Sequence, residues 1–307
     1  MRLSEIKFHF QTELSDLYSK SEIEELFAIF CEHFLKLNKI ELRNSFENGL
    51  SAIDSEKFLN SVSKLKTGKP FQQILGETEF YGMKFFVNEH VLIPRPETEE
   101  LLELSINKIK EKIKNNQDLN VGLREPEPDN RKSETNKHFR ILDIGTGSGI
   151  IPIVLKKYFP DAEVSAIDIS DKALEVAKRN AEFHKTEIHF INQDYLNEDL
   201  DGIYDIIISN PPYIGTDENA EIEDSVKGFE PNMALFSPTS DALVFYRKIA
   251  EDCKNNLAEN GMLFLEINQK LGPETLGLYD HILSEGYLLK DISGNDRIIF
   301  GRKQVWK

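Results

Sequence analysis

The stretch from residue 141 to residue 150 reads Ile-Leu-Asp-Ile-Gly-Thr-Gly-Ser-Gly-Ile. Aliphatic residues before the glycines are typical of a buried strand, and those after them open a helical pattern. Glycines at such a junction let the backbone approach a ligand closely, and the first helical turn offers free N–H groups. The spacing G-x-G-x-G, unlike the dinucleotide-binding G-x-G-x-x-G, disfavours a dehydrogenase and favours another nucleoside ligand. The predicted ligand-binding residues are Gly145, Thr146, Gly147, Ser148 and Gly149.

Strand-like and helix-like patterns alternate beyond this stretch. The predicted strands are 139–144, 162–168, 187–192, 204–209 and 261–267, and the clearest predicted helices are 171–184 and 240–257. Runs such as Ile206-Ile207-Ile208 are apolar without alternation, as in strands that are buried on both faces. The pattern predicts an α/β fold with an open, mostly parallel sheet and helices on both sides. Two further runs, 287–293 and 297–302, predict a C-terminal antiparallel hairpin.

Acidic residues lie at or just after the ends of two predicted strands. Asp168 ends the second strand, 23 residues after Gly145, and its carboxylate can accept both hydroxyls of a ribose. Capping of the next helix is the competing role, but Ser170 suits that role better. After the third strand, Asp194 can accept a hydrogen bond from an adenine amino group while Tyr195 lines the ring. A solvated aspartate in a strand-to-helix turn explains Asp194 equally well.

The fourth strand runs directly into Asn210-Pro211-Pro212-Tyr213. Two prolines remove two backbone donors and drive Asn210 into an extended conformation. The Asn210 side chain and a nearby carbonyl can then accept both hydrogens of a planar –NH2 group, whose nitrogen faces an incoming electrophile. Tyr213 supplies an aromatic wall for a flat or cationic group. An ordinary Asn-Pro turn is the alternative, and the preceding glycine loop and Asp168 disfavour it.

Residues 1–69 predict a helical bundle. Ser21 and Glu24 form a predicted capping box that opens an apolar-rich helix extending to Leu37. Two shorter helical patterns follow at 40–50 and 55–65. The aromatic stripe of this region is expected to be core rather than binding surface, and it consists of Phe27, Phe30 and Phe34.

Residues 70–96 predict a linking β-hairpin around 80–87, and 97–307 predict the main domain, which opens with a helix. Residues 115–137 contain few apolar side chains, so we expect them to form a flexible surface insertion. Residues 217–232 are strongly acidic. This loop either steers a basic partner or simply faces water.

The composition excludes several classes of protein. The 307 residues contain 53 acidic and 37 basic side chains, a net charge of −16, which disfavours a broad basic face for nucleic acid. Two cysteines far apart in the chain exclude a disulfide scaffold and a cysteine zinc site, and they fit a reducing cytoplasm. No apolar run reaches the roughly 18–20 residues of a membrane span, and the charged N-terminus does not resemble a secretory signal.

The Gly145–Gly149 loop, Asp168 and Asn210–Tyr213 together resemble the class I S-adenosylmethionine-dependent methyltransferases, whose sheet is Rossmann-like. Asn-Pro-Pro-Tyr resembles those that methylate amino groups. Phe71–Gly82 and Leu92–Glu99 closely resemble the HemK/PrmC family, as do Phe229-Glu230-Pro231 and Gly294–Arg297. That family methylates the side-chain amide of the glutamine in the Gly-Gly-Gln motif of class I peptide-chain release factors. Residues 115–137 are longer than is typical of it, and Gln73 replaces its usual Tyr or Ala.

The resemblance implies S-adenosyl-L-methionine as cofactor, S-adenosyl-L-homocysteine as product, and no metal. It implies cofactor binding by the glycine loop, Asp168, Asp194, Tyr195 and Asn210. Substrate binding would fall to Asn210, Pro211, Pro212 and Tyr213, with Asn210, Pro211 and Tyr213 catalytic. It further implies release factors as partners, a monomer in the cytoplasm, no membrane and no sequence-specific binding to nucleic acid. The helical residues 1–69 would recognise the substrate or aid folding.

Two alternatives stay open. Asn-Pro-Pro-Tyr also serves DNA and RNA adenine-amino methyltransferases, but those enzymes usually carry a basic groove, which the net charge disfavours. A non-catalytic S-adenosylmethionine-binding adaptor is the other alternative. Loss of Asn210, Asp168 or a loop glycine would have favoured it, and all of these residues are present.

Overall fold

The computed structural model describes residues 1–120, 139–214, 228–237 and 239–303, with side chains up to 115 in the first of these ranges. The predicted insertion at 115–137 begins inside a helix, since α6 (Pro96–Asn120) continues to Asn120. The first residues of this segment are therefore helical, because adding one residue to an existing helix needs few apolar contacts. The flexibility expected of 115–137 stays a prediction. The rest of that segment and most of the acidic loop 217–232 lie outside the described residues.

Residues Met1–Thr78 form most of one compact unit. Its core is aromatic: Phe10 is fully buried and its ring lies 5.5 Å from that of Phe27 and 5.8 Å from that of Phe30. Phe34 packs edge-on against Phe58 at 5.2 Å. The prediction that this aromatic stripe is core is confirmed. The helices of the unit are α1 (Leu3–Leu14), α2 (Lys20–Leu35), α3 (Lys39–Asn44), α4 (Ala52–Leu65) and α5 (Phe71–Leu75).

Two local predictions for this unit were wrong. The capping box of α2 is formed by Ser19 and Glu22, not by Ser21 and Glu24: the Ser19 N–H donates to Glu22 Oε2 at 2.7 Å. The same Ser-x-x-Glu pattern occurs two residues earlier in the chain, where the backbone is still extended. The predicted helix at 40–50 ends at Asn44. Beyond it the backbone pairs with the N-terminal segment instead, with the Leu50 N–H donating to the Met1 carbonyl at 2.8 Å.

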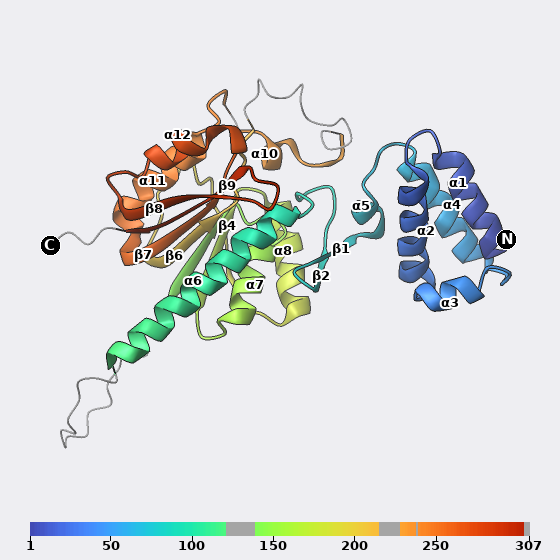
Figure 1. Ribbon diagram of the computed structural model, residues 1–307, viewed down its shortest axis with the longest axis horizontal. Helices are drawn as coiled ribbons and strands as arrows, with labels where there is room; N and C mark the ends of the chain where they lie inside the picture. The colour runs from blue at the N-terminus through green and yellow to red at the C-terminus, as the bar shows by residue number, and fades with distance from the viewer. Residues whose placement is uncertain (121–138, 215–227, 238, 304–307) are drawn as a thin grey trace, which may run out of the picture. The chain divides into compact units, whose positions relative to one another are not determined.

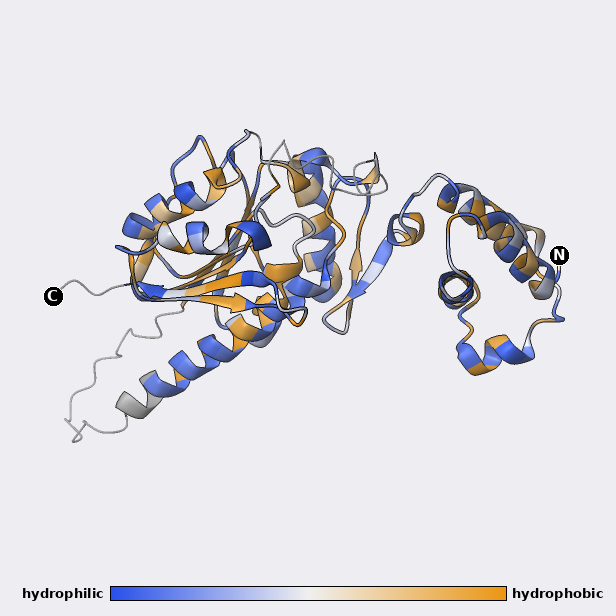
Figure 2. Cartoon of the chain, turned by 45° about the horizontal axis from the view of Figure 1, so that its top comes forward, coloured by the Kyte–Doolittle hydropathy of each residue, from blue (hydrophilic) through white to orange (hydrophobic). Residues whose placement is uncertain are grey.

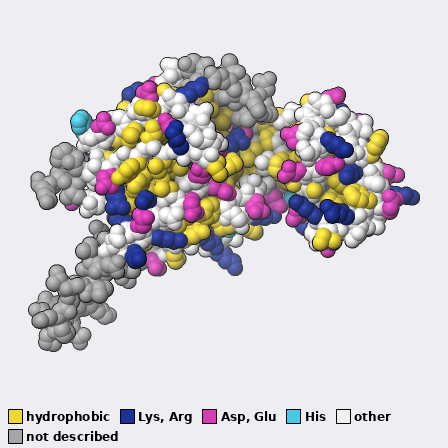
Figure 3. Space-filling model, in the orientation of Figure 1, with side chains coloured by type: hydrophobic (Ala, Val, Ile, Leu, Met, Phe, Trp, Pro, Cys, Tyr) yellow, Lys and Arg dark blue, Asp and Glu magenta, His cyan; other side chains and the backbone are white. Residues whose placement is uncertain are grey.

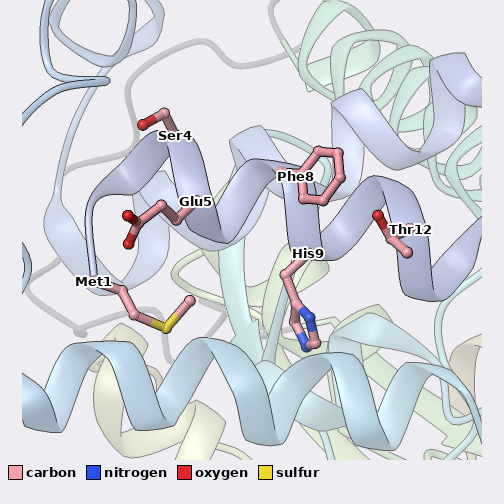
Figure 4. A pocket seen from close by; sticks show the side chains of 6 residues that line it. All are labelled: Met1, Ser4, Glu5, Phe8, His9 and Thr12. Atoms are coloured by element: carbon pink, nitrogen blue, oxygen red, sulfur yellow. The ribbon is translucent and has the colours of Figure 1, made fainter.

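Helix α1 carries a hollow on its outer side (Figure 4). Phe8, which is 69% exposed, stands beside it. The residues that line the hollow are Met1, Ser4, Glu5, Phe8, His9 and Thr12.

The second unit is built on a seven-stranded sheet with the order β5-β4-β3-β6-β7-β9-β8 (Figure 1). Strands β5 to β7 are parallel, whereas β9 runs antiparallel to both of its neighbours. The predicted fold class is therefore confirmed. The strands are β3 (Arg140–Ile144), β4 (Glu163–Asp168), β5 (His189–Asn192), β6 (Tyr204–Ser209), β7 (Leu257–Glu266), β8 (Leu283–Lys290) and β9 (Asp296–Lys303).

Helices cover both faces of this sheet, which is why its central strands are apolar on both sides. Along β6, Ile206 and Ile208 belong to the core under α6 and α7 (Ile150–Tyr158), while Ile207 belongs to the core under α11 (Val244–Asn256). Figure 2 shows the hydrophobic strands between these layers. Helix α8 (Asp171–His184) has the predicted bounds, and Ser170 caps it by accepting the Ala173 N–H at 3.2 Å.

Other boundaries moved by a few residues. Strand β7 begins at Leu257 rather than 261, and α11 begins at Val244 rather than 240. The predicted C-terminal hairpin is present, but β8 starts at Leu283. The hairpin predicted around 80–87 is formed by β1 (Glu77–Phe80) and β2 (Met83–Phe86). The remaining short elements are α10 (Asn232–Leu235), a 3-10 turn at Gln269–Leu271 and α12 (Gly272–Gly277).

Among the described residues, no helix combines the length and apolar character that a membrane span requires. On the face drawn in Figure 3, acidic and basic side chains are interspersed over each unit. For the residues drawn in colour, that face carries no broad basic surface of the kind that grips nucleic acid phosphates.

Candidate active site

A cavity of about 450 Å³ opens at the carboxyl ends of the parallel strands. Four segments that are far apart in the sequence meet there, namely the loops that follow β3, β4, β5 and β6. In open α/β sheets this edge is where ligands bind. The predicted site residues that line it are Gly145, Gly147, Asp168, Asp194, Tyr195, Asn210 and Pro212.

Some residues of the glycine loop line the cavity, and the others pack in the protein interior. Gly145 and Gly147 line the cavity and have φ of +76° and +54°. Gly149 instead packs against α8, where a Cβ atom would lie 2.9 Å from the Cβ of Ala177. Thr146 and Ser148 are buried. Among the described residues, Thr146, Ser148 and Gly149 are not part of the cavity lining, so their contact with a cofactor stays a prediction.

Asp168 is held at the cavity edge by two backbone donors. Its Oδ2 accepts the Gly147 N–H at 2.8 Å and its Oδ1 accepts the Ser170 N–H at 2.9 Å. Burial raises the pKa of Asp168, while these hydrogen bonds oppose the rise. Each carboxylate oxygen can accept a second hydrogen bond. The carboxylate can therefore receive a pair of hydroxyl groups from a ligand in the cavity.

The segment after β5 contributes one polar and one aromatic side chain to the cavity wall, those of Asp194 and Tyr195. Asp194 Oδ2 accepts a hydrogen bond from Asn197 Nδ2 at 2.9 Å. This turn is compatible with both alternatives weighed for Asp194, because one of its oxygens keeps acceptor capacity toward the cavity. Tyr195 is 5% exposed, and burial raises the pKa of its hydroxyl. Its ring is thus a buried part of the cavity wall.

Asn210 stands where β6 ends. The hydroxyl of Ser209 donates to the Ile144 carbonyl at 2.7 Å, which joins this end of β6 to β3. Asn210 Nδ2 donates to Thr98 Oγ1 at 3.2 Å. Pro212 lines the cavity, but Pro211 and Tyr213 are not among the described lining residues. Tyr213 is half-buried against the core under α11, where burial raises the pKa of its hydroxyl.

Two residues beside Asn210 escaped the sequence analysis. Thr98 Oγ1 donates to Glu266 Oε2 at 2.7 Å, and both side chains are buried. Burial raises the pKa of Glu266 to about 7, with the Thr98 hydrogen bond acting in the opposite direction. Glu266 ends strand β7, so the strand-end reasoning that selected Asp168 could also have selected it.

Glu230 anchors a second part of the cavity rim. Its side chain is 1% exposed, and it accepts the Ile93 N–H at 3.0 Å and Arg95 Nη2 at 2.6 Å. Val91 and Pro231, on either side of this junction, both line the cavity. The ion pair therefore joins two sequence stretches that had been noted for their family resemblance but had been given no role.

Asp143 is the other buried carboxylate near the loop. It is fully buried, and burial raises its pKa to about 7, with the Thr146 hydroxyl opposing the rise and the charge of Asp168 adding to it. Buried carboxyl groups with raised pKa values are concentrated at functional sites in proteins. Asp143 lies within the first quoted stretch, but its residue type alone did not indicate this environment.

Comparisons with known proteins identify the family of this chain. The methyltransferase small domain family matches residues 131–226. A release factor glutamine methyltransferase of Flavobacterium psychrophilum is 42% identical over 301 residues, which cover 97% of this chain and 98% of that protein. One of Bacteroides thetaiotaomicron is 36% identical over 97% of this chain and 99% of that protein. A solved methyltransferase structure from Pyrococcus furiosus aligns at 14% identity and a TM-score of 0.45, over 83% of this chain and 100% of that one. Given the near full-length identity to the first two relatives, the chain belongs to the release factor glutamine methyltransferase family.

Proposed function

We propose that the protein transfers a methyl group from S-adenosyl-L-methionine to the side-chain amide nitrogen of the glutamine in the Gly-Gly-Gln motif of class I release factors. Family membership supports the reaction class. The observation that carries the proposal is the meeting of Asp168 and Asn210 at one cavity of about 450 Å³. The Asp168 carboxylate can accept ribose hydroxyls and the Asn210 side chain can accept an amide hydrogen. A nucleoside cofactor and an amide substrate can therefore share this cavity.

The residues present fit the cofactor. The Asp168 carboxylate, oriented by the Gly147 and Ser170 N–H groups, would accept the two ribose hydroxyls, and its charge disfavours a phosphate there. Gly145 and Gly147 would allow close approach of the backbone, and Tyr195 with Asp194 would border the adenine. When bound, S-adenosyl-L-methionine supplies an electrophilic methyl group that needs no further activation and leaves S-adenosyl-L-homocysteine. We expect no metal to take part.

The amide nitrogen is the difficult partner, because its lone pair is delocalised into the carbonyl. Asn210 Oδ1 and the Pro211 carbonyl would accept the two amide hydrogens and hold the nitrogen in line for transfer. The same two acceptors would stabilise positive charge as it develops on nitrogen. Pro212 and Tyr213 would position the glutamine side chain. The proton on the methylated nitrogen is acidic enough to leave to solvent, so no strong general base is needed.

The test is methyl transfer from labelled S-adenosyl-L-methionine to a purified release factor, beside a release factor with Gln→Ala in its Gly-Gly-Gln motif. We expect label on the first and none on the second. Label on both would show that methylation occurs at an atom outside this glutamine. Label only on DNA or RNA would favour the adenine-amino alternative. Either of those results would overturn the proposal.

Asn210→Ala tests the role of the side chain in the same assay. We expect kcat to fall by about 100-fold or more, which is typical for loss of one preorganised hydrogen-bonding group. The Kd of S-adenosyl-L-methionine, measured by calorimetry, should change by less than about 1 kcal/mol in binding free energy. An unchanged kcat would show that Asn210 does not hold the amide.

The helical unit is part of the proposal. We infer that it contributes to binding of the release factor, because Phe8 offers an exposed aromatic contact beside the hollow on α1. The substrate acts in translation, so the expected compartment is the cytoplasm. We also expect the protein to act as a monomer. Sedimentation of the pure protein at 35.3 kDa would agree with the latter, and twice that mass would contradict it.

A further inference from the structure

Two buried side chains lead to the proposed catalytic amide of Asn210. Glu266 at the end of β7 is 1% exposed and Thr98 near the start of α6 is 6% exposed. The Thr98 hydroxyl is 2.7 Å from Glu266 Oε2 and 3.2 Å from Asn210 Nδ2. Thr98, Asn210 and Glu266 come from separate elements of the same unit, and the Thr98 hydroxyl lies between the other two side chains.

The chemistry of these groups decides which one donates and which one accepts in each of the two hydrogen bonds of Thr98. Above its raised pKa of about 7, Glu266 is ionised and its carboxylate can only accept hydrogen bonds. A threonine hydroxyl has a single proton to donate. Because that proton is directed to Glu266, the Thr98 oxygen can only accept from Asn210. Asn210 must then present its –NH2 to Thr98, which leaves Oδ1 on the opposite corner of the amide group.

We propose that Thr98 and Glu266 are positioning residues that fix the Asn210 amide with its carbonyl oxygen available to the substrate. This inference rests on the proposed function, in which Asn210 Oδ1 accepts an amide hydrogen. Without Thr98, the direct hydrogen-bond interaction of Asn210 with Glu266 would hold the amide alone. The two ends of the amide have nearly the same shape, so they would exchange more readily by rotation about χ2. The flipped form would present two donors to the substrate amide, which also needs acceptors.

The surroundings of Glu266 agree with a dedicated role for its side chain. The Tyr246 hydroxyl donates to the backbone carbonyl of Glu266 at 3.0 Å, so it is not directed to the carboxylate. Arg297, whose charge favours ionised Glu266, donates through Nε to Asp291 Oδ2 at 3.2 Å. A buried carboxylate is costly for stability compared with an apolar residue of the same size. Ordering of a neighbouring polar group is a role that an apolar residue could not fill.

The test compares Thr98→Val, which removes the hydroxyl at constant shape, with Thr98→Ser, which keeps it. Thr275→Val is the matched control, because Thr275 is also a buried threonine and its hydroxyl donates to a backbone carbonyl, that of Leu271, at 2.6 Å. We expect Thr98→Val to lower kcat by about 100-fold, the effect of a misplaced reacting group. The Kd of S-adenosyl-L-methionine should not change, Thr98→Ser should recover most of the rate, and Thr275→Val should keep the wild-type kcat.

The inference also requires that Thr98 act through Asn210. In single-turnover assays on an Asn210→Ala background, Thr98→Val should therefore cause no further loss of rate. A wild-type kcat in Thr98→Val, or the same fold-loss with and without Asn210, would overturn the inference. Absence of transfer to the release factor by the wild-type enzyme would instead overturn the proposed function.

A second readout needs no substrate. The side-chain ¹⁵N–¹H signals of Asn210 can be assigned by their loss in Asn210→Ala. We expect slow hydrogen exchange of this –NH2 group in the wild type and at least tenfold faster exchange in Thr98→Val, with Thr275→Val like the wild type. Equal exchange in all three proteins would show that Thr98 does not hold the amide, whatever the substrate is.

Discussion

Gly149→Ala should destabilise the protein through the contact between α7 and α8. The new Cβ would lie 2.9 Å from Ala177 Cβ and 3.1 Å from Ala177 Cα, and one of these two helices would have to move. Overpacking of this kind costs about 1–3 kcal/mol. The φ of +79° adds about 1–2 kcal/mol, because an L-residue is disfavoured there. We therefore expect the free energy of unfolding to fall by about 2–5 kcal/mol.

Gly147→Ala is the matched comparison, and its effect should appear in binding. Its φ is +54°, and a Cβ would meet no atom within 4 Å among the described residues. The cost in stability should thus be only the conformational term of about 1–2 kcal/mol. Since Gly147 lines the cavity, the added methyl group would occupy space that the cofactor needs. Loss of about 1.4 kcal/mol of binding free energy would raise the Kd tenfold.

Urea denaturation and calorimetric titration with S-adenosyl-L-methionine separate the two effects. We expect Gly149→Ala to lose more stability than Gly147→Ala, and Gly147→Ala to lose more affinity. Equal stability of the two variants would refute the description of Gly149 as a packing residue. Wild-type affinity in Gly147→Ala would refute the assignment of the cavity to the cofactor.

Two further predictions concern pH dependence and substrate binding. Burial raises the pKa of Asp143 from 3.8 to about 7, so the stabilisation due to its neutral form is complete below the unfolded pKa and is lost as pH rises through 7. Asp143→Asn should make the fall in unfolding free energy between pH 5 and pH 8 shallower, by up to about 1.4 kcal/mol per pH unit within the titration range. An unchanged slope in urea denaturation would contradict this prediction. Phe8→Ser should raise the KM for the release factor several-fold with little change in kcat, whereas Ile292→Ser, at a 94% exposed position of the other unit, should leave the KM unchanged; a KM that Phe8→Ser does not alter would exclude this surface from binding.

The parts of the site that follow local rules could be predicted from the sequence. Gly145 and Asn210 come directly after a strand and Asp168 ends one, and parallel strands bring their carboxyl ends to one edge. Thr98 and Glu266 could not be paired in this way, because they are 168 residues apart and their contact depends on how α6 crosses the sheet. Long-range side-chain contacts of this kind leave no periodic pattern in a single sequence.

Boundary errors had a different origin. Around Ser19 and Ser21 two capping patterns overlap, and residue types alone do not show at which residue the backbone turns helical. The packing role of Gly149 escaped the sequence analysis for a related reason, and its contact with a cofactor stays a prediction. The sequence indicates that a glycine is required, but the neighbour that requires it, Ala177, belongs to another helix.

The position of β9 has a consequence for how the chain is made. This strand lies between β7 and β8 in the sheet although it follows both in the sequence. A nascent chain that has been synthesised only as far as residue 295 therefore exposes an unpaired edge of β7, and in the described sheet β8 has no other strand to join. Every described residue of the cavity lies at or before Phe245 and has already been made by then. Unpaired strand edges recruit other chains, so the period of greatest risk of aggregation during translation falls after the binding residues exist and before Asp296–Lys303 closes the sheet.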